Sequence, residues 1–396
     1  MEKQFEFTSD ELENKLKGFK QQGITELTVH DQLLAKDKAR LIKFLKAVRR
    51  DAPELFVSIK ISPQIIDMEV VRALSCINCS VEMDFVQTVK GFDKKLYAKK
   101  CALLNQAALV FGVNLYFAEV PEAKGEGCAL EEKSASSPFG KKKGSNCSGG
   151  KGAGGAGSLA AESKALIVNG AGKNASSAAF SQDSLKAFKD RLDFTIAQYP
   201  NHIDFPQIEE KQEKSASPAN ISLSSLPSAS ASFSAQDIRF ARDIAFACRT
   251  FYSAGRAVPW FNSILMLLRI QASAFFADFA EWQRVNNCDF KSGYLPEEES
   301  HENIEKMQIL FLDMKLEEKR KGQALQAVND IVRLNGAFSR LVSDGQETVI
   351  ETEYNPDDLL SPESMDILSF ANDVCMCPCR VQIFINSDGE PDYRLA

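Results

Sequence analysis

The first 120 residues alternate between amphipathic segments and short apolar runs. Apolar residues at helical spacing predict helices over residues 36–50, 68–74 and 94–111. Short apolar runs predict buried strands at residues 24–29, 55–61, 80–85 and 113–120. Such regular alternation of strand and helix is typical of a parallel sheet covered by helices, either open or closed into a barrel.

Two low-complexity segments interrupt this pattern. Residues 122–181 are rich in Gly, Ala, Ser and Lys, and residues 210–232 are rich in Ser, Pro and Ala. The first segment has too few apolar residues to build a core, so it is predicted to be disordered, and the second is interpreted as an insert that serves as a linker. Between them, a helix is predicted over residues 183–198 and a strand over residues 202–208.

The remainder of the chain is predicted to be mainly helical. Phe240, Ile244 and Cys248 mark one buried helical face, and residues 260–282 and 299–341 continue the helical pattern, with a break at Gly322. Strands are predicted over residues 348–354 and 381–385, with a helix over 364–372 between them. The expected organisation is an α/β part over residues 1–208 that contains the insert 122–181, a linker over 209–233, a helical region over 234–345 and a small α+β tail over 346–396.

Composition narrows the class of protein. The net charge of −7 argues against a nucleic-acid partner, because such surfaces are basic. The basic run at residues 141–143 is interpreted as part of a solvated linker. No apolar run reaches the roughly 18 residues of a membrane helix, and the N-terminus lacks the apolar region of a signal peptide. We therefore expect a cytoplasmic protein whose ten cysteines are mostly reduced.

Candidate chemical motifs are few. Residues 150–155 match G-x-G-x-x-G, but their surroundings are more Gly, Ala and Ser, so the match is interpreted as chance. His30 and Asp31 end a predicted strand, which makes them site candidates, whereas His202 begins one and is interpreted as structural. Cys76 and Cys79 form a C-x-x-C pair without the second pair that a metal site normally has.

Cys375, Cys377 and Cys379 form the one cluster of cysteines remote from that pair, in the stretch Cys-Met-Cys-Pro-Cys. In an extended segment, alternation would point Cys375 and Cys379 to one side and Cys377 to the other. Three metal ligands would then require a bend at Pro378. Ordinary reduced cysteines are the alternative interpretation.

Several stretches, taken together in their order and spacing, resemble radical S-adenosylmethionine proteins of the cobalamin-linked class. They are residues 24–31, 65–74, 79–84, 92–96, 111–115, 200–204 and 255–261. The resemblance covers roughly residues 5–121 and 183–284. It implies an incomplete TIM-like radical S-adenosylmethionine barrel of about five parallel strands, followed by a mainly helical C-terminal region. An incomplete barrel exposes unpaired backbone groups at its edge, which another segment or chain is expected to cover.

The resemblance also implies where S-adenosylmethionine would bind. Groups near strand ends that could bond its ribose or amino group are Asp31, Glu82, Asp84, Asn114 and Glu119. Glu82 and Asp84 alternate with apolar residues, which is equally the pattern of a half-exposed strand. A glycine that is usual in the family's fourth strand is replaced in this chain, with Asp84 near its position. Residues 118–121 stand where the family has a glycine-proline turn.

The main departure from the family is the iron–sulfur motif. Its members hold a four-iron cluster with three cysteines spaced C-x-x-x-C-x-x-C, and this chain has no such triplet. Three functions are therefore expected as alternatives. The chain is a fragment or split subunit of a radical enzyme whose cluster, and cobalamin where used, come from an upstream polypeptide. Alternatively, it is a degenerate, non-catalytic binding protein, or a metalloprotein that uses Cys375, Cys377 and Cys379.

Overall fold

The computed structural model describes residues 16, 18–19, 24–29, 31–87, 91–118, 183–209 and 229–396. Predictions for residues 122–181 and 210–228, which include residues 141–143 and 150–155, and for His30 and Glu119 lie outside these residues.

A five-stranded parallel sheet forms the N-terminal part, with its strands in the order of the sequence. The strands are β1 Glu26–Val29, β2 Phe56–Lys60, β3 Cys79–Phe85, β4 Val110–Leu115 and β5 His202–Asp204. The predicted α/β class with a parallel sheet is thus confirmed. The consecutive order means that every connection between neighbouring strands crosses over through a helical segment.

The helices between the strands begin where polar side chains cap them. They are α2 Gln32–Lys36, α3 Lys38–Asp51, α4 Met68–Leu74, α5 Lys94–Gln106 and α7 Leu185–Ile196, with a short 3₁₀ turn η2 at Pro63–Ile65; α8 Pro206–Glu209 follows β5. Asp31, Asp37, Asp67 and Asp93 each accept backbone N–H bonds at a helix start. Such caps satisfy amide groups that have no partner inside the helix, so they fix where each connection turns.

One face of the sheet is apolar and packs against these helices. Phe85 of β3 contacts Tyr97 of α5, with ring centroids 4.2 Å apart, and Phe194 of α7, at 6.2 Å. Val81 and Met83 on the same strand are fully buried. The core therefore lies on this face of the sheet, and the polar side chains of the strands point to the other face.

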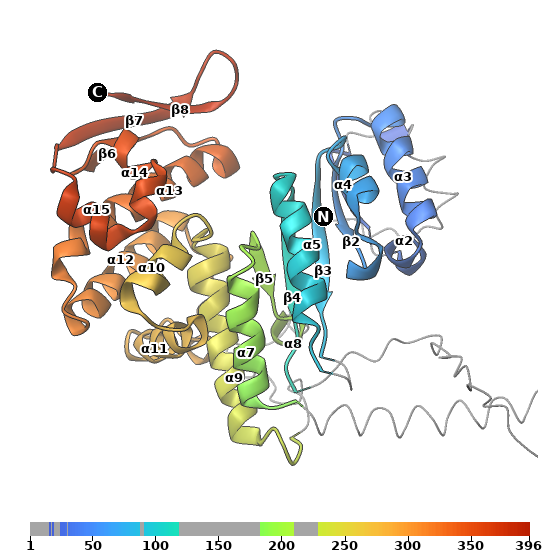
Figure 1. Ribbon diagram of the computed structural model, residues 1–396, viewed down its shortest axis with the longest axis horizontal. Helices are drawn as coiled ribbons and strands as arrows, with labels where there is room; N and C mark the ends of the chain where they lie inside the picture. Colours follow the sequence, from blue (N-terminus) through green and yellow to red (C-terminus); the bar gives the residue numbers. More distant parts are fainter. Residues whose placement is uncertain are drawn as a thin grey trace, which may run out of the picture.

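The helical region packs around Phe251 and continues the same core. Its elements are α9 Ala235–Cys248, the π-helix η5 Arg249–Ala254, α10 Phe261–Leu268, α11 Ala272–Val285, η6 Phe290–Ser292, α12 His301–Glu318, η7 Gly322–Ala324 and α13 Leu325–Asp344. The Phe251 ring lies 4.8 Å from Phe275 and 5.0 Å from Phe279, both edge-on. Figure 1 shows these helices on the β5 side of the sheet, with α2 to α4 at its other end.

An antiparallel sheet of three strands completes the described chain. It consists of β6 Thr348–Thr352, β7 Cys379–Ile385 and β8 Pro391–Leu395, with β7 in the middle. The connection between β6 and β7 contains α14 Pro356–Leu359, η8 Pro362–Met365 and α15 Ile367–Asp373. Tyr393 of β8 meets Phe338 of α13 edge-on, which seats this sheet on the helical region.

Ser253 of η5 connects the parallel sheet to the helical region. Its hydroxyl accepts the backbone N–H of Ile203 at 3.0 Å and donates to the Ile203 carbonyl at 3.2 Å. Tyr252 donates to the Pro200 carbonyl from the same π-helix. The backbone of the last parallel strand is thereby bonded to side chains rather than to a sixth strand among the described residues.

Three details of the predicted elements are wrong. The fourth strand begins at Val110 rather than 113, because the preceding helix ends at Gln106 and Ala108 adopts a φ of 51°. The fifth strand ends at Asp204 rather than 208, where Pro206 starts α8. Phe240 is not buried: its ring lies on the surface beneath Lys189.

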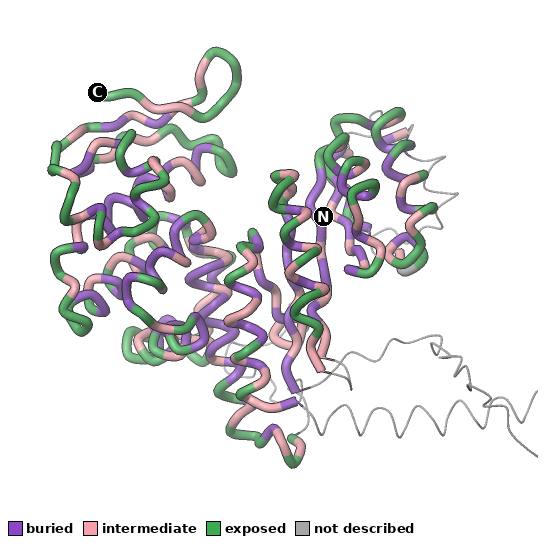
Figure 2. Tube along the Cα trace, in the orientation of Figure 1, coloured by how far each residue is buried: buried purple, intermediate pink, exposed green. Residues whose placement is uncertain are grey.

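Within the described residues, no single helix is long and apolar enough to cross a membrane. Phe261–Leu268 and Ala272–Ser292 reach the required length and apolar character only when taken together, and the chain bends by 93° between them. Both parts carry residues of the core, including Phe261 and Phe275, and Figure 2 shows buried positions recurring along them.

Candidate functional site

A row of polar side chains crosses the face of the parallel sheet that the helices leave free. Register pairs place these residues side by side, since aligned positions of neighbouring strands share a face. The pairs are Ser58 with Ser80, Lys60 with Glu82, Glu82 with Gly112, Asp84 with Asn114, Gly112 with His202, and Asn114 with Asp204. Most of these side chains are half-buried, so the face is a polar surface close to the core.

Asp84 is the centre of a closed group on this face. It pairs with Lys60 at 2.8 Å, accepts from Asn114 Nδ2 at 3.1 Å, and accepts from the Tyr116 hydroxyl at 3.4 Å. One carboxylate thus faces one ammonium and two neutral donors. The group is balanced in charge.

Glu82, His202 and Asp204 form a second group, which is open. His202 Nε2 lies 2.7 Å from Glu82 Oε1 and 3.5 Å from Asp204 Oδ2. One potential ligand atom from each residue lies within 4.8 Å of the others, and this is the one such group of three His, Cys, Asp or Glu residues found in the described chain. Two carboxylates therefore share a single imidazole, with less compensating charge than the group around Asp84.

Gly112 makes room for the His202 ring. A Cβ on Gly112 would overlap three atoms of the imidazole, Nε2 among them. Glycine on β4 is therefore required for the ring to lie flat against the sheet between the two carboxylates.

Burial and neighbouring charges act on the carboxylates of this open group. Burial raises the pKa of Asp204 above its ordinary value, a rise that His202 opposes and that Glu82 increases. Glu82 Oε2 is buried and has no hydrogen-bond partner among the described residues. A buried carboxylate oxygen without a partner is unfavourable, so this oxygen is suited to a bound cation or donor.

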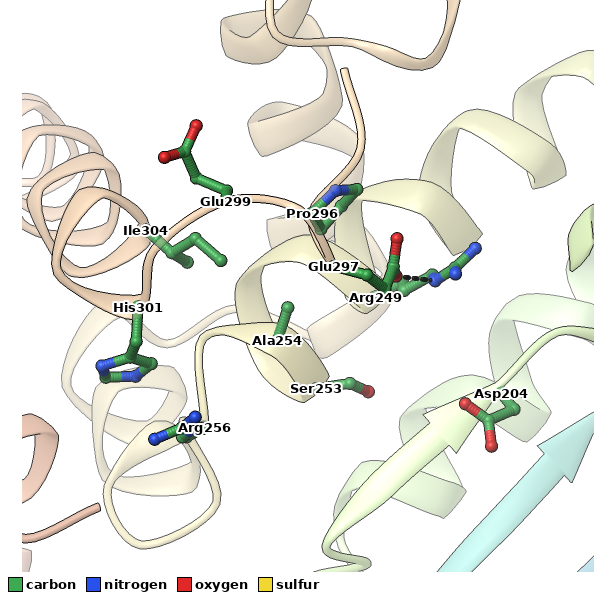
Figure 3. A pocket seen from close by; sticks show the side chains of 10 residues that line it. All are labelled: Asp204, Arg249, Ser253, Ala254, Arg256, Pro296, Glu297, Glu299, His301 and Ile304. Carbon is green, nitrogen blue, oxygen red and sulfur yellow. Dashed lines mark ion pairs between the residues drawn. The ribbon is translucent and has the colours of Figure 1, made fainter. Parts of the chain in front are cut away.

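A pocket of about 360 Å³ opens beside Asp204, between β5 and the helical region. Figure 3 shows Asp204 on its strand at one side, with Arg249, Glu297 and Ser253 between it and the more distant His301. Arg249 pairs with Glu297 across the pocket. Burial lowers the pKa of His301 to about 4, an effect to which Arg256 adds, so this imidazole is neutral at pH 7.

The structure places the site residues predicted from the sequence in different environments. Glu82, Asp84 and Asn114 meet on the polar face, in two groups. Asp31 instead caps α2, accepting from the backbone N–H groups of Leu33 and Leu34 at 2.7 and 3.2 Å. Its carboxylate has a local structural role that a strand-end position did not reveal. Glu119, as noted, is not described.

The cysteine candidates do not assemble a three-ligand site in the described chain. Cys375 and Cys377 are exposed, and Cys379 donates to the Cys377 carbonyl at 2.9 Å. Their sulfur atoms do not form a group of ligand atoms within 4.8 Å of one another. The bend at Pro378 therefore does not bring the three together. Cys76 is exposed while Cys79 is buried, and the pKa of Cys79 is raised to about 11 by burial.

His202 and Asp204 are the site residues that the sequence analysis missed. His202 was interpreted as structural because it begins its strand, but β5 is only three residues long, so its start and its end reach the same part of the face. The sequence signal that could have indicated these two residues is the polar–apolar alternation His202–Ile203–Asp204, next to a strand that contains a glycine. The pairing register was needed to connect it with Glu82.

The arrangement suits binding of a cation or of a polar ligand. Two carboxylates and an imidazole supply hard and borderline ligand atoms. A comparison with protein-family models, curated proteins and solved structures finds no match for this chain.

Proposed function

We propose that the chain forms an incomplete TIM-like barrel of the radical S-adenosylmethionine type and works as a subunit beside a polypeptide that supplies the iron–sulfur cluster. The consecutive parallel order β1 to β5 supports this, because it is the order of one part of such a barrel. The polar face would then be the inner face of the barrel. The resemblance of residues 24–31, 79–84 and 200–204 motivates the choice of family.

The observation that carries the proposal is the difference between the two edges of the sheet. At β5, Ser253 bonds the backbone of Ile203. At β1, the Thr25 carbonyl accepts from Phe56 on the inner side, so alternation directs the amides of Glu26 and Thr28 outward. Both residues are exposed, and no described strand lies on the outer side of β1. An edge of this kind is suited to receive a further parallel strand.

S-adenosylmethionine is the proposed ligand of the polar face. Its ammonium and ribose hydroxyl groups are donors that match carboxylate and amide oxygens near the carboxyl ends of β3 and β4. Asp84 and Asn114 are the proposed partners, since they are adjacent in register and half-buried. The iron–sulfur cluster, and cobalamin where the reaction uses it, would come from the partner polypeptide.

The proposal is tested by anaerobic purification of the protein from its own source, with intact mass and iron measured in one sample. We expect iron together with a C-x-x-x-C-x-x-C sequence, either in a second polypeptide or in a chain heavier than 43.8 kDa. Hydrogen exchange at Glu26 and Thr28 should be slower in that assembly than in the isolated chain. A chain of 43.8 kDa that is iron-free and alone would contradict the proposal.

Ligand binding is tested separately by calorimetric titration of that assembly with S-adenosylmethionine. Asp84→Asn combined with Asn114→Ala should weaken binding by about tenfold or more, as expected for loss of hydrogen bonds to a charged ligand. Ser58→Ala, on the same face in the middle of β2, is the matched control. Binding without iron would identify a non-catalytic binding protein instead. Equal affinity in the double variant would exclude this face as the site.

A further inference from the structure

We propose that Glu82, His202 and Asp204 bind one divalent first-row transition-metal ion, at a site separate from any iron–sulfur cluster. The ligand set consists of one imidazole nitrogen and two carboxylate oxygens, a combination that suits Zn²⁺, Mn²⁺ or Fe²⁺. The site goes beyond the S-adenosylmethionine function and does not depend on it, because every ligand belongs to this chain.

The first argument is convergence. The three residues come from two strands that are not adjacent, β3 and β5, and they are up to 122 positions apart in the sequence. The parallel register nevertheless brings the two carboxylates to the same nitrogen, at 2.7 and 3.5 Å. A proton on His202 Nε2 can form a good hydrogen bond to only one of the two carboxylates, whereas a metal ion bound between the three groups can contact both carboxylates.

The second argument is the unsatisfied oxygen. Glu82 Oε2 is buried without a hydrogen-bond partner in the described chain. The neighbouring Asp84, on the same strand and face, has three partners of its own. The contrast is between a carboxylate whose Oδ1 has three partners inside the fold and one with a buried oxygen that has none among the described residues.

The third argument is space. Gly112 leaves a hollow in β4 that the His202 ring fills, so the ring is held between the carboxylates. On the other side, Asp204 lines the pocket of about 360 Å³ that Figure 3 shows. Three protein ligands with an open side are typical of metal sites that also bind water or a substrate. The open coordination positions would face Arg249 and Ser253.

The test is titration of the metal-depleted full chain with Co²⁺, followed by competition with Zn²⁺. To remove the exposed and half-buried thiols of the described chain, the background carries Cys76→Ser, Cys375→Ser, Cys377→Ser and Cys379→Ser. We expect one Co²⁺ per chain, with visible absorption and without the ultraviolet charge-transfer band of a thiolate ligand. Absence of stoichiometric binding in this background would overturn the proposal, and would do so whether or not S-adenosylmethionine binds.

Single substitutions locate the site. Glu82→Gln and His202→Gln should each weaken Co²⁺ binding by about 100-fold, at the upper end of what loss of even an indirect supporting group costs. Glu299→Gln removes a carboxylate that lines the same pocket but lies outside the ligand group, and it should leave the affinity unchanged. Circular dichroism verifies that each variant is folded.

Gly112→Ala provides a variant in which all three ligands remain. The added methyl group must displace the His202 ring, so affinity should fall about tenfold or more, which is the range for disturbed support of a metal ligand. Unchanged affinity in folded Gly112→Ala, or full stoichiometry in His202→Gln, would contradict the assignment.

Discussion

The helical region and the polar face of the sheet both hold charged groups near the core, but they hold them differently. In the helical region, buried Lys315 lies 2.7 Å from Asp278 and 2.6 Å from Glu318. Buried Arg340 lies 2.6 Å from Glu305. On the sheet, Glu82 and Asp204 share His202, and one Glu82 oxygen has no partner among the described residues.

This difference distinguishes charged groups that stabilise the fold from charged groups that the fold holds in place without being stabilised by them. The charge of each of these buried cations is matched by a carboxylate of the described chain, and removing that carboxylate leaves the cation uncompensated. The sheet group is incomplete within the described chain. Removing one of its carboxylates lessens repulsion as well as attraction. The size of the stability change therefore tells the two kinds of group apart.

The largest effect is expected for Glu305→Ala. Arg340 would keep its position beside His301 but lose its carboxylate, leaving a buried guanidinium uncompensated. The free energy of unfolding, from urea denaturation, should fall by about 3–5 kcal/mol. Glu318→Ala is the control, because Glu318 is half exposed and Lys315 retains Asp278; its effect should stay within about 1 kcal/mol. Equal losses would remove the distinction between buried and exposed partners.

The next effect is pH dependence from Asp330. Burial raises its pKa from 3.8 to about 6, although the backbone N–H groups of Glu353 and Tyr354 bond it. The folded state then holds a proton that the unfolded state releases, so stability falls as pH rises from about 4 to 6. Relative to the wild type, Asp330→Asn should gain up to about 3 kcal/mol over this window.

His301 should give the opposite slope. Its pKa of about 4 lies below the ordinary 6.5, so the unfolded state binds the extra proton and stability rises between pH 4 and 6.5. Relative to the wild type, His301→Gln should therefore lose less stability as the pH falls through this window. Urea denaturation at several pH values measures both difference curves, and curves of the same sign would contradict the two assignments.

A smaller effect is expected for Gly112→Ala in the metal-free protein. The methyl group overlaps the His202 ring, and accommodating it should cost about 1–3 kcal/mol, the range for overpacking. At Gly322 an added Cβ meets nothing within 4 Å, so Gly322→Ala should be neutral or stabilising by up to about 1 kcal/mol. Thermal denaturation of the two variants gives the comparison; a neutral Gly112→Ala would mean that the ring is not fixed there.

The smallest effect is expected for Glu82→Gln without metal. The substitution loses a half-buried contact with His202 and also relieves repulsion with Asp204, so the change should be within about 1 kcal/mol of zero. A loss as large as that of Glu305→Ala would show that the sheet group is structural, and the contrast between the two regions would fail.

Much of the fold could be predicted because local signals agreed with it. Strand–helix alternation gave the parallel sheet, and the break at Gly322 corresponds to η7 between two long helices. The end of α5 was not predicted, because the left-handed residue that follows it is Ala108 rather than a glycine, which would have indicated a helix end. Phe240 was assigned to the core from its spacing alone, whereas its ring lies at the surface against Lys189.

The site was predicted only in part, for a physical reason. Glu82, Asp84 and Asn114 lie near strand ends, which the sequence can indicate. The separation of Glu82 from Asp84 into an open and a closed group depends on the partners across the sheet, Lys60 on one side and His202 on the other. Pairing register and the hollow at Gly112 are properties of the assembled sheet, so residue type and spacing alone could not predict them.

The π-helix η5 has a consequence for how the molecule tolerates change in length. An α-helix advances by about 100° per residue, so the phase of everything after it depends on each residue that it contains. Arg249–Ala254 forms a wider turn, and from it Ser253 reaches the Ile203 backbone. Deleting one residue here would restore the ordinary period but rotate Ser253 away from β5 and re-aim Arg256. The number of residues in η5 therefore determines how the helices that follow are rotated relative to the parallel sheet.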